Sequence, residues 1–275
     1  MNRQDIWKNG VLTKRSIEWT QPYGIPGYTW NAIKGCLHAC EWRMPDGAIA
    51  ECYAKTVAER VAQAAYPNGF AHLSFDEKEL NEPRKLKKPA GIFCDSMSDL
   101  VGAQVPTEWI EEVIQVMRET PQHIYMLLTK NPPRLRQFKW PENVWVGVSA
   151  PPTFMYGKEL SQEQQFAWYS TALKTLGEVD VPVRWTSIEP LSWNVAPLIE
   201  THWSSLEWAV IGAASNGRVN HQPDRKVFES TFKALGGLPL FLKGNIDRRL
   251  AIDVCGKWCE EFPLPTSDWR ERRQS

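Results

Sequence analysis

The chain carries no excess charge of either sign and no long apolar run. Its 32 Lys and Arg residues balance 32 Asp and Glu residues, so no overall field draws it to nucleic acid or anionic lipid. No stretch of about 18 apolar residues is present, which argues against a transmembrane helix. The first ten residues also lack an apolar run of signal-peptide length. We therefore expect a soluble cytoplasmic protein with no membrane partner.

The sequence also lacks repeats, low-complexity tracts and any shift in composition that would mark a linker. With 275 residues, 43% of them hydrophobic, it can build one large core. We predict a single domain over residues 1–275. It would have a surface excursion at about 66–89, where proline, glycine and charge concentrate, and a C-terminal extension at about 245–275.

Short, nearly continuous apolar runs alternate with helix-like segments. Such runs are typical of strands covered on both faces in a parallel sheet. With 30–33 as a first strand, there are six or seven βα units, which predicts an α/β fold: a partial (β/α)6-type TIM barrel with a mostly parallel sheet. The further expected strands are 91–94, 124–128, 144–148, 183–188, 208–211 and 238–242; the expected helices are 55–65, 107–119, 161–176 and 224–235.

Polar residues follow the ends of these strands. Because the carboxyl ends of parallel strands meet at one edge, we expect these residues to share a rim. Each also has an ordinary structural interpretation, as a helix cap, a surface lysine or an ion-pair partner. The residues are Ser96, Ser98 and Asp99 after the second strand, then Lys130, Ser149, Glu189, Arg218 and Lys243 after the next five in turn.

Three cysteines, Cys36, Cys40 and Cys52, fall in the loop after the first predicted strand. Their spacing fits three interpretations: buried core cysteines, a zinc site with His38 as a conceivable fourth ligand, or an iron–sulfur cluster. The eleven residues before Cys52 contain a turn signal at 44–47, so they could loop out and return the third sulfur. Three thiolates would leave one coordination position of a metal centre open.

The remaining motifs are weaker. Cys255 and Cys259 favour packing under the C-terminal segment over a second metal site, for which Cys94 is the only spare thiol. No His-rich or paired-carboxylate motif supports a zinc-dependent hydrolase. Most of the 14 tryptophans are expected in the core and rim, where a subset could stack on a base.

Short ordered stretches carry a family resemblance across all but about the last thirty residues. They are Ile17-Glu18-Trp19-Thr20, Trp30-Asn31, Gly35-Cys36, Cys52-Tyr53-Ala54, Ser96-Met97-Ser98-Asp99-Leu100, Thr120-Pro121-Gln122-His123, Leu128-Thr129-Lys130, the run 143–149, Ser187-Ile188-Glu189-Pro190-Leu191 and Phe241-Leu242-Lys243. The chain resembles the phage-associated three-cysteine-motif family, a domain of unknown function related to radical S-adenosylmethionine (SAM) enzymes of the spore photoproduct lyase type.

The resemblance implies a partial barrel whose Cys36, Cys40 and Cys52 hold a [4Fe–4S] cluster. SAM would bind the fourth iron, and an electron from an external one-electron reductant would release a 5′-deoxyadenosyl radical. Two features depart from the family pattern. Radical SAM enzymes usually have two residues between the second and third cysteines, where this chain has eleven, and Gly212-Ala213-Ala214-Ser215 stands where the family often has Gly-Gly-Glu-Ser.

Within that scheme, the rim residues receive roles from their chemistry. Ser96, Ser98 and Asp99 would take the methionyl ammonium or ribose hydroxyls of SAM, and Lys130 would offset its carboxylate. Ser149 and Glu189 would hold the ribose or the sulfonium side, and Tyr53 would pack on adenine or shield the cluster. Arg218 and Lys243 would face an anionic substrate, such as a nucleotide or nucleic-acid base.

The prediction is therefore a radical SAM enzyme, without a choice between lyase, isomerase and transferase. The alternative is a non-catalytic metal-binding partner protein on the same fold.

Overall fold

The computed structural model describes residues 1–4, 7–8, 11–12, 17–215 and 219–264. Within these residues the main sheet has eight strands in the order β1-β4-β9-β10-β11-β14-β15-β18. Every pairing from β4 to β18 is parallel, and β1 pairs antiparallel with β4 at one edge. The strands are β1 (Asn2–Arg3), β4 (Gly27–Trp30), β9 (Gly91–Cys94), β10 (Ile124–Thr129), β11 (Val144–Ser149), β14 (Val183–Ile188), β15 (Trp208–Ile211) and β18 (Leu240–Leu242).

Helices connect most of these strands, and short hairpins decorate the loops. The helices are α1 (Tyr53–Arg60), α2 (Glu77–Leu80), α3 (Glu82–Lys85), α4 (Thr107–Glu119), α5 (Gln162–Gly177), α6 (Ala196–Thr201), α7 (Arg225–Leu235) and α8 (Arg248–Cys255), with 3-10 turns η1 (Glu18–Thr20), η2 (Pro22–Gly24), η3 (Gln63–Ala65), η4 (Pro132–Gln137) and η5 (Trp203–Ser205). The short strands are β2 (Trp7–Lys8), β3 (Val11–Leu12), β5 (Ile33–Lys34), β6 (Glu41–Arg43), β7 (Ile49–Glu51), β8 (Ser74–Phe75), β12 (Phe154–Met155), β13 (Lys158–Glu159), β16 (Ala214–Ser215) and β17 (Asn220–His221).

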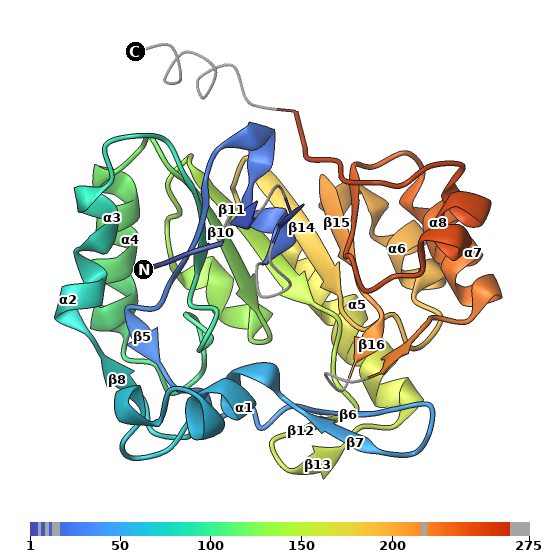
Figure 1. Ribbon diagram of the computed structural model, residues 1–275, viewed down its shortest axis with the longest axis horizontal. Helices are drawn as coiled ribbons and strands as arrows, with labels where there is room; N and C mark the ends of the chain where they lie inside the picture. Colours follow the sequence, from blue (N-terminus) through green and yellow to red (C-terminus); the bar gives the residue numbers. More distant parts are fainter. Residues whose placement is uncertain (5–6, 9–10, 13–16, 216–218, 265–275) are drawn as a thin grey trace.

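The predicted α/β class and the mostly parallel sheet are confirmed. The sheet is open: among the described strands, β1 and β18 form its two edges and do not pair with each other, so no closed barrel exists there. Between β10 and β11, where no helix was predicted, the connection contains only the 3-10 turn η4, which begins at Pro132 and Pro133. In Figure 1 the loops after the parallel strands gather along the lower edge of the sheet.

Local signals determine where the longer helices begin and end. Ser161 and Gln164 form a reciprocal capping box at the start of α5. The Asp224 carboxylate accepts the N–H groups of Lys226 and Val227 at the start of α7, and Gly236 ends that helix in the left-handed region. These signals explain why the predicted boundaries of both helices lie within one residue of the observed ones.

Side chains alternate between the two faces of the sheet, and both faces are buried. One face packs against the helices, and Ile92 and Cys94 of β9 belong to it. The other face holds a tryptophan-rich cluster in which Trp19 from η1 lies 5.1 Å from Trp185, ring centroid to ring centroid. Gly147 makes room for the Trp185 indole, since a Cβ there would overlap the ring. Burial on both faces explains the uninterrupted apolar runs.

The segment 66–89, predicted to be a surface excursion, contains β8, α2 and α3 and contributes to the core. Leu80 is buried with the helix-side cluster, and Phe75 stacks on Trp109 at 5.3 Å between ring centroids. The segment therefore packs on the domain, although much of its surface is exposed.

The C-terminal extension adds backbone pairing at the β18 edge. Leu242 N–H donates to the Cys259 carbonyl (2.9 Å), and Glu261 N–H donates to the Leu240 carbonyl (3.0 Å). Cys259 is buried in the core, whereas Cys255 at the end of α8 is half-buried. Residues 265–275 lie outside the described part of the chain. No helix among the described residues combines the length and apolarity that crossing a bilayer needs.

Candidate functional site

The eleven residues between Cys40 and Cys52 form a β-hairpin. β6 and β7 pair antiparallel, with Glu41 opposite Glu51. At the base of the hairpin, Cys52 N–H donates to the Cys40 carbonyl (3.1 Å). Residues that face each other in an antiparallel pair have Cα atoms about 4.5–5.5 Å apart. The insertion therefore returns the third cysteine to the second, so the long interval does not separate them.

Contacts on two sides hold this hairpin in place. β12 pairs with β6, which makes a four-stranded sheet of β13-β12-β6-β7. Arg43 forms an ion pair with Glu159 of β13 (2.7 Å). At the hairpin turn, Asp46 lies 3.5 Å from His221 of β17. The hairpin thus reaches from the loop after β4 to the loop after β15, across the lower edge of the sheet (Figure 1).

The three cysteines line one cavity of about 120 Å³, and all three thiols are free. In the part of the chain that the structure describes, no three His, Cys, Asp or Glu side chains group as ligands of one metal ion. The cysteines of an iron–sulfur cluster instead each bind a separate iron. Three free thiols around one cavity therefore fit a cluster with three cysteine ligands.

Burial keeps two of the three thiols, those of Cys36 and Cys40, protonated near neutral pH. Burial raises the pKa of Cys36 to about 12, and the Asp99 carboxylate adds to that shift. Burial likewise raises the pKa of Cys40 to about 11, against the opposing charge of Lys130. Burial would lower the pKa of Lys130, but Cys40, Cys52 and Asp99 raise it above its ordinary value. Lys130 is therefore a permanent cation beside three potential thiolates.

The raised pKa of Cys36 predicts unusual alkylation kinetics for the metal-free protein. Only the thiolate reacts, so the rate at Cys36 should rise about tenfold per pH unit from pH 7 to pH 10. An ordinary thiol, with a pKa near 8.5, would level off before the end of that range. Iodoacetamide labelling followed by peptide mass spectrometry measures the alkylation rate at Cys36. A rate that levels off near pH 9 would contradict the raised pKa of this thiol.

The Asp99 carboxylate links the cysteine loop to the ends of β9 and β10. It is buried, and its carboxylate accepts Thr129 Oγ1 (2.7 Å) and Lys130 N–H (2.8 Å). His38 Nδ1 lies 3.5 Å from Asp99 Oδ2, and the imidazole is almost fully buried. The Asp99 carboxylate therefore already has hydrogen-bond donors within the protein. Its contacts orient both His38 and the Lys130 backbone.

Hydrogen bonds connect the loop after β9 to residues on both sides of the cysteine loop. Asn31 Oδ1 accepts Met97 N–H (2.9 Å) and the Ser96 hydroxyl (3.1 Å), and the Tyr53 hydroxyl donates to the Ser96 carbonyl. Ser98 forms a bridge with Gly35, and its buried hydroxyl oxygen has no hydrogen-bond partner among the described residues. Ser98 Oγ and Asp95 Oδ2 are thus two buried side-chain oxygens of this loop that have no hydrogen-bond partner among the described residues.

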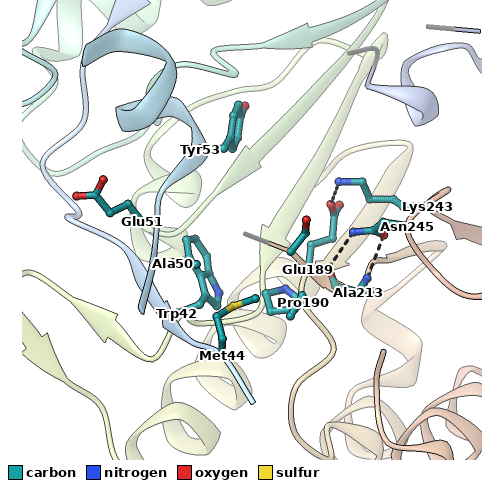
Figure 2. Close-up of a pocket in the computed structure, with 12 residues that line it drawn as sticks. Trp42, Met44, Ala50, Glu51, Tyr53, Glu189, Pro190, Ala213, Lys243 and Asn245 are labelled. Atoms are coloured by element: carbon teal, nitrogen blue, oxygen red, sulfur yellow. Dashed lines mark hydrogen bonds and ion pairs between the residues drawn. The ribbon is translucent and has the colours of Figure 1, made fainter. Parts of the chain in front are cut away.

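A second pocket, of about 190 Å³, lies on the other side of the hairpin and is shown in Figure 2. Trp42, Met44 and Tyr53 come from the hairpin and α1, and Glu189 and Lys243 face them from the ends of β14 and β18. Lys243 Nζ lies 2.5 Å from Glu189 Oε2, and Ser187 Oγ donates to the other carboxylate oxygen (3.0 Å). The pocket therefore has an aromatic wall opposite a polar one.

The predicted site residues separate into groups. Tyr53, Glu189 and Lys243 share the second pocket, and Lys130 lies electrostatically next to the cysteine cavity. Ser149 ends β11 beside Ser187 of β14 and lines neither space. Arg218 lies outside the described residues.

Most residues of this pocket were not among the predicted site residues, and Asn245 and Trp42 are the two with the clearest structural roles. Asn245 anchors the polar wall: its side chain accepts Ala213 N–H (3.1 Å) and donates to the Ala213 carbonyl (2.9 Å). Trp42 lines the aromatic wall. A large aromatic residue two positions after a ligand cysteine, inside an insertion, was the sequence signal that could have identified Trp42.

Residues 14–229 match the model of a family described as "Protein of unknown function (DUF5131)", and the chain belongs to that family. No curated protein matches the chain. Two solved structures that are similar are variants of spore photoproduct lyase. The first, with bound AdoMet and dinucleoside spore photoproduct, is 11% identical with a TM-score of 0.44 over 81% of this chain and 64% of that chain. The second, with dinucleoside spore photoproduct, is 10% identical with a TM-score of 0.45 over 82% and 64%.

This chain therefore aligns with less than two thirds of those chains. The association with phages that the resemblance implies stays a prediction.

Proposed function

We propose that this protein is a radical SAM enzyme in which Cys36, Cys40 and Cys52 hold a [4Fe–4S] cluster. One observation carries the proposal: three free thiols line one cavity, because the hairpin returns Cys52 to Cys40 although eleven residues separate them. A bound and reduced cluster would supply the electron for cleavage of SAM to methionine and the 5′-deoxyadenosyl radical.

The protein's own residues would bind and orient SAM. Lys130 carries a permanent charge beside the thiols and is suited to offset the SAM carboxylate. In the loop after β9, Ser98 is better suited than Asp99 to meet the ammonium, because the Asp99 carboxylate already accepts protein donors. Tyr53 and Glu189 line the second pocket, where they would receive the nucleoside half. Ser149 at the end of β11 stays a candidate for the ribose.

The substrate we propose is a nucleotide or a nucleic-acid base. The sequence predicted that Lys243 would face an anionic substrate as a cation, and the role that we propose for it is different. Its ammonium is neutralised by Glu189, so it would act as an oriented hydrogen-bond donor within an ion pair. A free cation for a phosphate would have to come from elsewhere.

Metal analysis after anaerobic reconstitution tests the proposal. We expect about four irons and four sulfides per chain, and 5′-deoxyadenosine by mass spectrometry when SAM and dithionite are added. Stoichiometric zinc without iron would instead support the non-catalytic metal-binding protein. A reconstituted cluster whose spectrum SAM does not perturb would reject the enzyme.

A further inference from the structure

The β12–β13 hairpin, which follows β11, packs against the loop of the first two cysteines. β12 pairs with β6 through Phe154 and Glu41, directly after Cys40. The Thr153 hydroxyl oxygen accepts Arg43 N–H (3.1 Å). In Figure 1, β12 and β13 lie beside β6 and β7 below the main sheet. A segment more than a hundred residues away in the sequence is therefore part of the structure around these cysteines.

The turn of this hairpin contacts His38, which lies between the first two cysteines in the sequence. Tyr156 N–H donates to the His38 carbonyl (2.6 Å), and the two rings meet edge to face with their centroids 5.2 Å apart. The imidazole also contacts Asp99, with Nδ1 3.5 Å from Oδ2. His38 is only 3% exposed, whereas Tyr156 is 46% exposed. The Tyr156 ring is therefore an outer cover over a buried imidazole that lines the cysteine cavity.

The backbone is strained on both sides of this contact. Tyr156 and Gly157 form the two-residue turn of the hairpin, and both have a positive φ, 54° and 72°. Such turns favour asparagine or aspartate followed by glycine, because a larger side chain in the left-handed region is costly. Ala39, next to His38, also has a positive φ of 48°. A tyrosine at a turn position that disfavours it indicates that its ring serves a contact rather than the turn.

The Tyr156 phenol also lies within electrostatic reach of the thiols. Burial raises the pKa of Tyr156 to about 12, and the charges of Asp99, Cys36 and Cys40 add to the shift. The ring does not line the cysteine cavity itself. It is therefore a neighbour of the first two thiols that leaves the space between them free.

We propose that Tyr156 is a positioning residue for the iron–sulfur site: its ring holds His38 in place and covers the Cys36–Cys40 segment against water and oxygen. The role at a cluster rests on the proposed function, whereas the cover over the thiols is a property of the chain itself. Because Asp99 and Tyr156 both contact His38, the imidazole cannot turn outward without losing both contacts. The shell around a metal site controls the access of solvent to it, and this hairpin supplies part of that shell.

The first test uses the metal-free, full-length protein. Tyr156→Gly deletes the ring and keeps the turn, because glycine adopts positive φ readily. Iodoacetamide should alkylate Cys36 and Cys40 about tenfold faster in this variant than in wild type, since the loop opens more easily. Cys255, half-buried at the end of α8, is the internal reference and should react equally fast in both proteins. Tyr156→Phe keeps the ring and should label like wild type.

Urea denaturation separates this role from a merely structural one. Relief of the left-handed turn offsets the loss of the ring contact, so the unfolding midpoint of Tyr156→Gly should stay close to that of wild type. A chelator of ferrous iron should then remove iron from the anaerobically reconstituted variant about tenfold faster than from wild type. Phe166→Ala, which removes an exposed aromatic residue of α5, is the matched control and should lose iron like wild type.

Each outcome has a distinct meaning. Faster labelling of Cys36 and Cys40, faster iron loss, and unchanged values for Cys255 and the urea midpoint support the inference. Equal labelling in wild type and Tyr156→Gly overturns it and leaves the cluster assignment standing. A lower urea midpoint with faster labelling of all three cysteines also overturns it, because Tyr156 would then be merely structural. Faster labelling without faster iron loss overturns the protection of the cluster.

Failure of the proposed function gives a different result. A wild-type protein that takes up no iron would reject that function and, with it, the role of Tyr156 at a cluster. The labelling of the metal-free protein would still show whether the ring covers the thiols, so the two failures are distinguishable.

Discussion

Replacing any one of Cys36, Cys40 and Cys52 by alanine is expected to remove 5′-deoxyadenosine formation entirely, down to the assay background. Each thiol lines the same cavity, and a cluster with only two cysteine ligands would be held poorly. The expected loss extends to the metal: reconstituted variants should contain far less iron and sulfide than wild type. Both quantities are measured on the same anaerobic samples, by metal analysis and mass spectrometry.

Cys255→Ser is the matched control for these variants. Cys255 is half-buried at the end of α8 and does not line the cavity, so its replacement should leave iron content and product formation unchanged. A Cys52→Ala protein that still forms 5′-deoxyadenosine would show that the third ligand has been misassigned. Equal loss in Cys255→Ser would indicate a general effect of thiol removal instead.

The largest expected effect on stability is that of Trp185→Ala, which should lower the free energy of unfolding by about 3–5 kcal/mol. Trp185 is fully buried and lies 5.1 Å, centroid to centroid, from both Trp19 and Trp208. The indole also packs closely against Gly147, so its removal would leave a cavity at this position. Urea denaturation followed by circular dichroism measures the change.

Trp203→Ala provides the comparison for the same truncation at the surface. Trp203 is 45% exposed, and its indole N–H donates to the Leu235 carbonyl (2.9 Å). Its replacement should cost only about 1 kcal/mol, mainly through that hydrogen bond. Similar losses for the two variants would contradict the assignment of Trp185 to a packed core.

The strands were predictable because burial on both faces leaves a local trace. The observed bounds Gly91–Cys94, Val183–Ile188 and Trp208–Ile211 equal the predicted ones, since each is a short apolar run between turn signals. The helix Thr107–Glu119 was equally readable from its apolar spacing after Pro106. In each case the information lies within a few neighbouring residues.

The β6–β7 hairpin was predicted only as a looped insertion, because its strands have little of that local signal. Glu41, Arg43 and Glu51 are charged and partly exposed, and β6 also pairs with β12, more than a hundred residues away. The role of Asp99 was hidden for a similar reason. Its partners Thr129 and Lys130 come from another strand end, and only the assembled sheet makes the carboxylate a structural acceptor.

By itself, the sequence determined the α/β class, most strand and helix bounds and the three cysteines as a candidate donor set, since these depend on side-chain pattern and thiol chemistry. Tertiary structure alone decided that the three thiols share a cavity, and that Tyr53, Glu189 and Lys243 meet Trp42 in a separate pocket. The physical reason is that convergence of side chains depends on pairing between distant strands, whose registers and partners no short stretch of sequence encodes.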